Sequence, residues 1–346
     1  MRRKSLLLFV IFLLILTVIP TSSLAVESLN FQEEKNSSEI KNIKEKVEEK
    51  ATEKILYKEA EELLLSHLKG LGQDIEAGSD EYSQFLLKML IEDHDEELTK
   101  HKHYKSLRIY ASEYLYQTET FGDVADEVTE MSIEQISKIA NEEEMLMQLN
   151  TELIMDPNDE GVSILSSYSG SKAAQYALDW STHGGKKRNP LYNKHKYDCT
   201  NFASQAVLAG GKKQNVPSPV KTGITQSTTR WYSIRYENWR SNHFVYAWNE
   251  STSWVRVVDF YSYWSQRVPT KNYTNRSSVI SYANTGDIVQ LRDDGGRRYH
   301  SMVVTAKTSN NLRVTYHTDG NGNDVRNQLI TNISDKNRFT VLSFTR

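Results

Sequence analysis

The 346-residue sequence predicts an α+β protein, in which a purely helical region precedes a region that mixes helices with β-hairpins. Three observations support this fold class. Residues 26–155 contain no proline and are rich in Glu, Lys and Leu, which are strong helix formers. Residues 171–209 contain two further helical patterns. Residues 286–318 alternate short β-branched runs with Gly-rich turns, which is typical of antiparallel hairpins.

The first 25 residues have the pattern of a secretory signal peptide. Residues 2–4 are basic, residues 6–19 are apolar, and Ser23 and Ala25 are small. This pattern predicts export, with cleavage after Ala25. The apolar run is shorter than the roughly 20 residues that span a bilayer. We therefore expect the mature chain to be secreted, either free outside the cell or associated with the cell wall; an uncleaved anchor is the alternative.

The net charge of −3 hides an asymmetry along the chain. Residues 26–160 carry a net charge of −20, whereas residues 161–346 carry +14. We therefore predict an acidic helical region at 26–156, a linker at 157–170 and a second domain at 171–346. Opposite charges on two regions predict different partners, or contact of each region with the other.

Within the acidic helical region, the spacing of apolar residues predicts individual helices. One helix is expected over 55–71, and two more near 82–92 and 105–117. Ser132 and Gln135 have the spacing of a capping box, which predicts the start of a last helix. Nothing in this region indicates a catalytic site.

The second domain contains Cys199, the only cysteine of the chain. A lone thiol in an exported protein indicates an intermolecular partner or a reactive group; a buried structural cysteine is the alternative. Asp198 is placed to cap a helix that begins at Cys199 and ends at Gly210 and Gly211. Unpaired N–H groups and the helix dipole favour an anion in the first turn of a helix. We therefore expect a lowered thiol pKa, which the charge of Asp198 opposes.

A thiol nucleophile requires a base, and the segment GDIVQLRDDGGRRYHSMVVT at 286–305 supplies a candidate. It has the pattern of two strands joined by a Gly-rich turn, with His300 at the start of the second strand. A third strand ends at His317, which is placed to hold the ring of His300 in one tautomer. Asp319 and Asn321 are alternatives for this third position.

These segments together resemble the putative amidase domain family of secreted bacterial proteins. The resemblance rests on YDCTNFASQAVLAGG, GDIVQL, HSMVVT and YHT, with AAQYALDW and NPLYN upstream, and covers about residues 168–346. It implies a branch of the papain-like cysteine hydrolases, alongside NlpC-type peptidases and CHAP amidases. It implies a nucleophile at the head of a helix packed on an antiparallel sheet. The implied nucleophile is Cys199, the implied base is His300, and the third position carries over to His317.

The segment between the nucleophile and the base is rich in aromatic residues. Trp231 and Trp254 are candidates for a substrate-binding groove, with burial in the core as the alternative, and Asp198 is a further candidate contact. No HExxH motif or paired cysteine ligands occur, so we expect no metal and no other cofactor. We expect no nucleic acid partner, because the aromatic residues are not interleaved with basic ones.

The sequence therefore predicts a secreted, cysteine-dependent amidase or peptidase that hydrolyses an amide C–N bond, with peptidoglycan or a peptide as the substrate. Anionic wall polymers are further expected partners because the second domain is basic. The alternative is a non-catalytic module that binds the cell wall with the same fold. Such a module would not need a cysteine, a histidine and a third polar residue together.

Overall fold

The computed structural model describes residues 55–154, 168–181, 188–240, 243–318 and 324–346. All of them belong to one unit, Lys54–Arg346. The predicted signal peptide, the start of the acidic helical region and most of the predicted linker lie outside the described residues. None of the described helices is long and apolar enough to cross a membrane.

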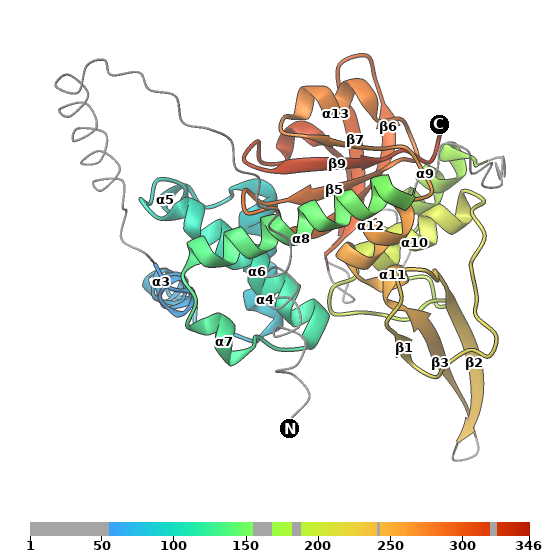
Figure 1. Cartoon of the computed structure of the whole chain (residues 1–346), viewed down its shortest axis with the longest axis horizontal. Helices are drawn as coiled ribbons and strands as arrows, with labels where there is room; N and C mark the ends of the chain where they lie inside the picture. Colours follow the sequence, from blue (N-terminus) through green and yellow to red (C-terminus); the bar gives the residue numbers. More distant parts are fainter. Residues whose placement is uncertain (1–54, 155–167, 182–187, 241–242, 319–323) are drawn as a thin grey trace, which may run out of the picture. The chain divides into compact units, whose positions relative to one another are not determined.

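The described part of the acidic helical region is helical, as predicted (Figure 1). Its helices are α3 (Tyr57–Gly70), α4 (Asp80–Glu92), α5 (Glu96–Thr99), α6 (Tyr104–Phe121), α7 (Asp126–Thr129) and α8 (Ile133–Ile154). The helices predicted over 55–71, 82–92 and 105–117 correspond to α3, α4 and α6. Each has an apolar stripe that is buried in a shared core, because residues three and four apart lie on one face of a helix.

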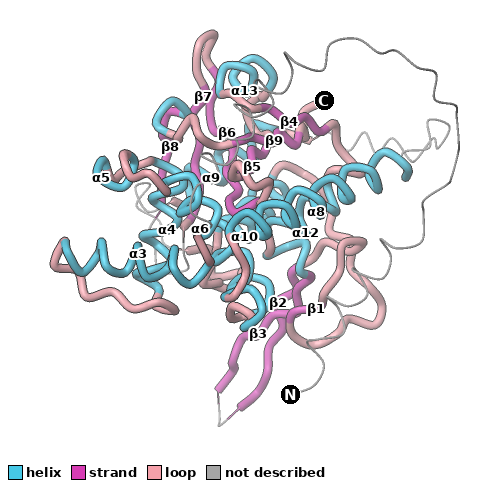
Figure 2. Tube along the Cα trace, turned by 60° about the vertical axis from the view of Figure 1, so that its left-hand side comes forward, coloured by secondary structure: helices cyan, strands magenta, loops and turns pink. Residues whose placement is uncertain are grey.

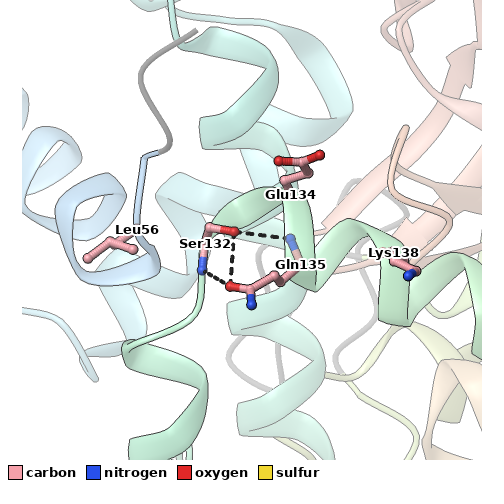
Figure 3. A pocket seen from close by; sticks show the side chains of 5 residues that line it. All are labelled: Leu56, Ser132, Glu134, Gln135 and Lys138. Carbon is pink, nitrogen blue, oxygen red and sulfur yellow. Dashed lines mark hydrogen bonds between the residues drawn. The ribbon is translucent and has the colours of Figure 1, made fainter. Parts of the chain in front are cut away.

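The predicted capping box at the start of α8 is present. The Ser132 amide donates to Oε1 of Gln135 at 2.9 Å, and the Gln135 amide donates to Oγ of Ser132 at 3.3 Å (Figure 3). The same two residues line a surface pocket together with Leu56, Glu134 and Lys138. Every residue of this lining belongs to the helical region, and none of the predicted site residues is among them.

The second domain combines helices with two sheets and completes the predicted α+β fold (Figure 2). Its helices are α9 (Gly170–Asp179), α10 (Cys199–Ala209), α11 (Thr252–Val255), α12 (Val257–Trp264), α13 (Arg276–Tyr282) and the short 3-10 helix η2 (Ile330–Asn332). Its strands are β1 (Ile224–Thr225), β2 (Ser233–Arg240), β3 (His243–Ser251), β4 (Thr270–Tyr273), β5 (Ile288–Arg292), β6 (Arg298–Lys307), β7 (Leu312–His317), β8 (Asp324–Leu329) and β9 (Arg338–Leu342).

The larger sheet is antiparallel and has the strand order β4-β9-β5-β6-β7-β8. Its central strands β5, β6 and β7 are the three strands that the sequence predicted. Successive side chains of a strand point to opposite faces of a sheet. One face of this sheet packs on α9, α10 and α12 through Ile288, Val303 and Leu342. The other face joins the core of the helical region through Val289, Met302, Val304, Val314, Tyr316 and Val341.

The smaller sheet has the order β1-β3-β2, and its β2–β3 hairpin extends away from α11 and α12 in both views (Figures 1 and 2). Trp239 and Tyr246 of this hairpin are exposed. The hairpin therefore contributes little to the core, whereas the α11–α12 segment that follows it is almost wholly buried.

Candidate active site

Cys199 is the first residue of α10, where the sequence predicted it. The helix packs against β6, and the backbone N–H of Ser301 donates a hydrogen bond to the Cys199 thiol. Oγ1 of Thr200 lies 3.1 Å from Oγ of Ser301 and 3.7 Å from the Cys199 sulfur. These contacts fix the thiol beside the strand that carries His300.

The prediction of a lowered thiol pKa is wrong for this structure. Cys199 is only 3 % exposed, and its burial is the largest cause that raises the pKa to about 12. The negative charge of Glu119 is the next cause, and Asp198 adds to it. The hydrogen bonds from Thr200 and the Ser301 amide lower the pKa but do not offset burial. Desolvation of the anion therefore outweighs the effect of the helix N-terminus.

Asp198 is the N-cap residue of α10, but its side chain makes no capping bond, contrary to the prediction. Its Oδ1 accepts a hydrogen bond from Nδ2 of Asn201 at 2.8 Å. Its Oδ2 lies 2.7 Å from Nδ1 of His317 and 3.2 Å from Nη1 of Arg188. Burial raises its pKa to about 6, against the opposing effect of Arg188. A carboxylate with these partners is already occupied, so substrate binding by Asp198 remains only a prediction.

His300 is completely buried and its ring makes an edge-to-face contact with Tyr316 at 4.6 Å. Neither ring nitrogen has a hydrogen-bond partner. Burial lowers its pKa to about 3, so the imidazole is neutral. Buried polar atoms are nearly always hydrogen-bonded, and an exception indicates a functional role or a bound water. His300 is therefore a neutral imidazole without a hydrogen-bond partner in this structure.

His317 lies on the α10 side of the sheet and not against His300. Its Nδ1 contacts Asp198 at 2.7 Å, its Nε2 lies 3.0 Å from the carbonyl oxygen of Trp180, and its ring stacks on Phe202 at 3.6 Å. A carboxylate and a carbonyl are both hydrogen-bond acceptors, so each ring nitrogen of His317 faces an acceptor. In this structure His317 therefore holds the start of α10.

The register of the sheet explains why the two histidines are separated. The β6–β7 pairing places Val303 opposite Thr315, and continuing it places Ser301 opposite His317. His300, one residue earlier, consequently points to the other face. The alternatives Asp319 and Asn321 lie outside the described residues.

Two residues that the sequence did not single out complete a buried charge network. Arg188 lies 3.2 Å from Asp198 and 2.9 Å from Asp324, and His317 lies 3.7 Å from Asp324. Arg188 and the ring of His317 therefore lie between two carboxyl groups beside Cys199. Arg188 follows two lysines in the sequence and had the pattern of an exposed basic loop, so no local signal identified it.

Trp231 and Trp254 are fully buried, which corresponds to the core alternative rather than to an open groove. Nε1 of Trp254 donates to Oδ1 of Asn201 at 2.9 Å, and Nε1 of Trp231 donates to Oγ of Ser204 at 3.0 Å. Both tryptophans thus anchor polar side chains of α10. Neither offers a ring face to a substrate in this structure.

The described residues contain no group of three His, Cys, Asp or Glu side chains arranged to hold a metal ion. A thiol and a neutral imidazole are the two groups that nucleophilic attack with proton transfer requires, although the register turns the ring of His300 to the face opposite α10. This chemistry requires that His300 and Cys199 come into hydrogen-bond contact.

Comparison with known families gives one match, to the family described as "Putative amidase domain", over residues 167–342. The match spans just over half of the chain and contains Cys199, His300 and His317. No curated protein and no solved structure matches the chain. The description of the family points to hydrolysis of amide bonds. With the α+β fold and a thiol at the head of a helix on the sheet, this chain belongs to the putative amidase domain family.

Proposed function

We propose that the protein is a secreted, cysteine-dependent amidase related to the papain-like, NlpC-type and CHAP hydrolases, with peptidoglycan as its substrate. One observation carries the proposal. The sole cysteine heads a helix on the strand whose His300 is neutral, buried and without a hydrogen-bond partner. Two reactive groups held on adjoining elements, in a domain of an amidase family, are best explained by catalysis.

In the proposed reaction, His300 takes the proton of the Cys199 thiol and the thiolate attacks the carbonyl carbon of the amide. A C–S bond forms and the carbonyl oxygen becomes an oxyanion. Collapse of this intermediate breaks the C–N bond, and the imidazolium of His300 gives its proton to the leaving amine. Water, deprotonated by His300, then attacks the thioester. The products are a carboxylic acid, an amine and the free thiol.

The backbone supplies the groups that stabilise the oxyanion. The first N–H groups of α10 have no partner within the helix, and the Ser301 N–H already points at the sulfur. Donors fixed before the reaction stabilise developing negative charge without reorganisation. A substrate carbonyl beside Cys199 would meet them.

Peptidoglycan is the proposed substrate because the signal-peptide pattern predicts export and because peptidoglycan contains amide bonds. The basic second domain, with a net charge of +14 over residues 161–346, supports anionic wall polymers as additional partners.

The test is digestion of purified peptidoglycan, with product masses measured for the wild type, Cys199→Ala and the matched control Thr229→Ala at an exposed site. We expect new fragments that carry a free amine and a free carboxyl group, absent with Cys199→Ala and unchanged with the control. Identical fragments from Cys199→Ala would disprove cysteine catalysis.

One observation favours the alternative of a non-catalytic wall-binding module. Neither nitrogen of His300 is hydrogen-bonded to Cys199, so the catalytic pair is not assembled in this structure. The same digestion distinguishes the two functions when it is combined with sedimentation on insoluble walls. A binding module would co-sediment with the walls and release no fragment under any condition.

A further inference from the structure

The proposed catalytic pair is closed to solvent. Cys199 is 3 % exposed and His300 is 0 % exposed. The protonated thiol described above is a consequence of this burial. An amide cannot reach the thiol without movement of the residues that cover it, so the identity of those residues matters.

The acidic helical region contacts the segment immediately before Cys199. Lys196 and Tyr197, immediately before Asp198, contact α4, α6 and the loop before α4. Nζ of Lys196 lies 3.3 Å from Oδ1 of Asp80 and 3.2 Å from the carbonyl oxygen of Gly78. The hydroxyl of Tyr197 lies 3.1 Å from Oγ of Ser83 and 2.7 Å from Oγ1 of Thr118. Two helices therefore hold the approach to the nucleophile from the same side.

Glu119, the residue after Thr118 on α6, is a buried carboxyl group whose charge, when present, raises the pKa of the Cys199 thiol. Its Oε2 accepts a hydrogen bond from the amide of Val257 at 3.4 Å, and its buried Oε1 has no hydrogen-bond partner. Its charge disfavours a thiolate at Cys199. Burial raises the pKa of Glu119 itself to about 8, so its charge adds to the effect of burial on the thiol only at alkaline pH.

A second set of contacts, made of ion pairs, joins the helical region to the β5–β6 hairpin that carries His300. Three arginines of this hairpin pair with three glutamates of α6 and α8. Arg297 lies 2.8 Å from Glu113 and 2.5 Å from Glu143, Arg298 lies 2.6 Å from Glu144, and Arg292 lies 3.3 Å from Glu144. Buried pairs of this kind are screened much less by salt than exposed ones. The opposite charges of the two regions are therefore joined at the hairpin.

A third set of contacts, made of hydrogen bonds, joins the helical region to the turn before β9. Nη2 of Arg108 on α6 donates to Oδ1 of Asn337 at 2.7 Å, and Nδ2 of Asn337 donates to the Leu90 carbonyl at 2.9 Å. The hydroxyl of Tyr299, next to His300, donates to the same Oδ1 at 2.6 Å. The base is thus tied to α4 and α6 through its own neighbour in the chain.

We propose that the acidic helical region, residues 55–154, is a built-in inhibitor that closes the site by gripping the nucleophile segment and the base hairpin together. The proposal rests on Cys199 and His300 being the catalytic pair. Activation then consists of loosening these contacts, which exposes the thiol and releases the hairpin that carries His300.

The experiment measures alkylation of Cys199 by iodoacetamide in the full chain at pH 7.5, followed by intact mass. A pKa near 12 instead of 9.0 leaves on the order of a thousandfold less thiolate. We therefore expect the folded wild type to react at least about a hundredfold more slowly than urea-unfolded protein. The variant Ser83→Ala/Thr118→Val removes both hydroxyl partners of Tyr197 from the helical side.

Two hydrogen bonds of about 1 kcal/mol each correspond to a rise in the alkylation rate of roughly 10- to 30-fold. The matched control is Ser66→Ala/Thr129→Val, the same chemical changes at sites in the helical region that do not bond to the second domain. It should react like the wild type. Far-UV circular dichroism and the melting temperature confirm folding. If the double variant does not fold, Tyr197→Phe removes the same two bonds from the other side.

Rapid alkylation of the folded wild type would overturn closure. A slow wild type with an equally slow Ser83→Ala/Thr118→Val variant would overturn the role of the helical region. If alkylation accelerates as expected but no variant releases peptidoglycan fragments, closure of the thiol by the helical region is upheld and the proposed substrate fails. The two proposals are therefore tested separately.

Discussion

The two faces of the larger sheet treat their histidines in opposite ways. On the α10 face, His317 uses both ring nitrogens, in contacts with Asp198 and with the Trp180 carbonyl. On the face that packs against the helical region, His300 is equally buried but uses neither. A buried ring nitrogen without a hydrogen-bond partner costs stability. His300 is therefore retained at a cost that His317 does not have. His317 is therefore held by two hydrogen-bond acceptors, whereas His300 is buried without any, and the variants below test what each difference means for function.

The largest expected effect comes from His300→Asn. General-base catalysis contributes about 10²–10⁴-fold, and the thiolate also depends on this base. We therefore expect turnover of peptidoglycan to fall by at least that factor, measured as the initial rate of fragment release. Cys199→Ala gives the background rate for the comparison. A variant that retained more than a tenth of the wild-type rate would contradict the role of base.

The same variant makes a prediction about acid stability. His300 has its pKa lowered from 6.5 to about 3 in the folded state, so between these values the unfolded chain binds more protons. Stability is then lost as pH falls through 6.5 toward 3. Urea unfolding at pH 7 and at pH 5 should give a smaller difference for His300→Asn than for the wild type. An unchanged difference would mean that the ring is not buried in its neutral form.

An intermediate effect is expected for His317→Gln. Removing one partner of a buried charged group costs up to about 3–5 kcal/mol, and the cost here is reduced because Arg188 still contacts Asp198. We expect a large drop in the urea midpoint at pH 6 and a smaller loss of turnover than in His300→Asn. The double variant Asp198→Asn/His317→Gln should recover part of the stability. If stability were unchanged while turnover fell as far as in His300→Asn, His317 would be the third catalytic residue.

The smallest effect is expected for Thr200→Val, which keeps the side-chain shape and removes the 3.1 Å contact with Ser301. The loss of one buried hydrogen bond corresponds to about 1 kcal/mol. Because Oγ of Ser301 also accepts from Nε2 of Gln290, Ser301 keeps a partner. Combining the change with Ser301→Ala in a double-mutant cycle isolates the coupling between α10 and β6. A coupling near zero would show that the contact does not position the nucleophile.

Most of the fold could be predicted from local sequence patterns. The spacing of apolar residues located α3, α4 and α6, and the Ser132–Gln135 spacing located the start of α8, because helix periodicity and capping are properties of neighbouring residues. The strands β5, β6 and β7 followed from alternation and turns for the same reason. Cys199 at the head of a helix was also a local prediction, and it is confirmed.

Features that depend on register or on distant segments could not be predicted. Which face a histidine occupies depends on the pairing of β6 with β7, and a one-residue difference separated His317 from His300. The thiol pKa depends on Glu119, which precedes Cys199 by 80 residues and reaches it only through the packing of α6. Arg188 meets Asp198 from a loop whose sequence resembles exposed surface, and Asp324, the first residue of β8, meets Arg188. In each case the deciding contact is absent from the local sequence.

The burial of Cys199 also determines how readily the thiol is oxidised. Sulfur is oxidised through its thiolate, and susceptibility follows thiolate character and exposure. A thiol that is 3 % exposed and protonated resists peroxide, and it resists pairing with the thiol of another molecule. Under the proposed function, the closed form that is slow to react with a substrate is thus also the form that resists oxidation. Opening the site would expose the thiol to substrate and to oxidants at the same time.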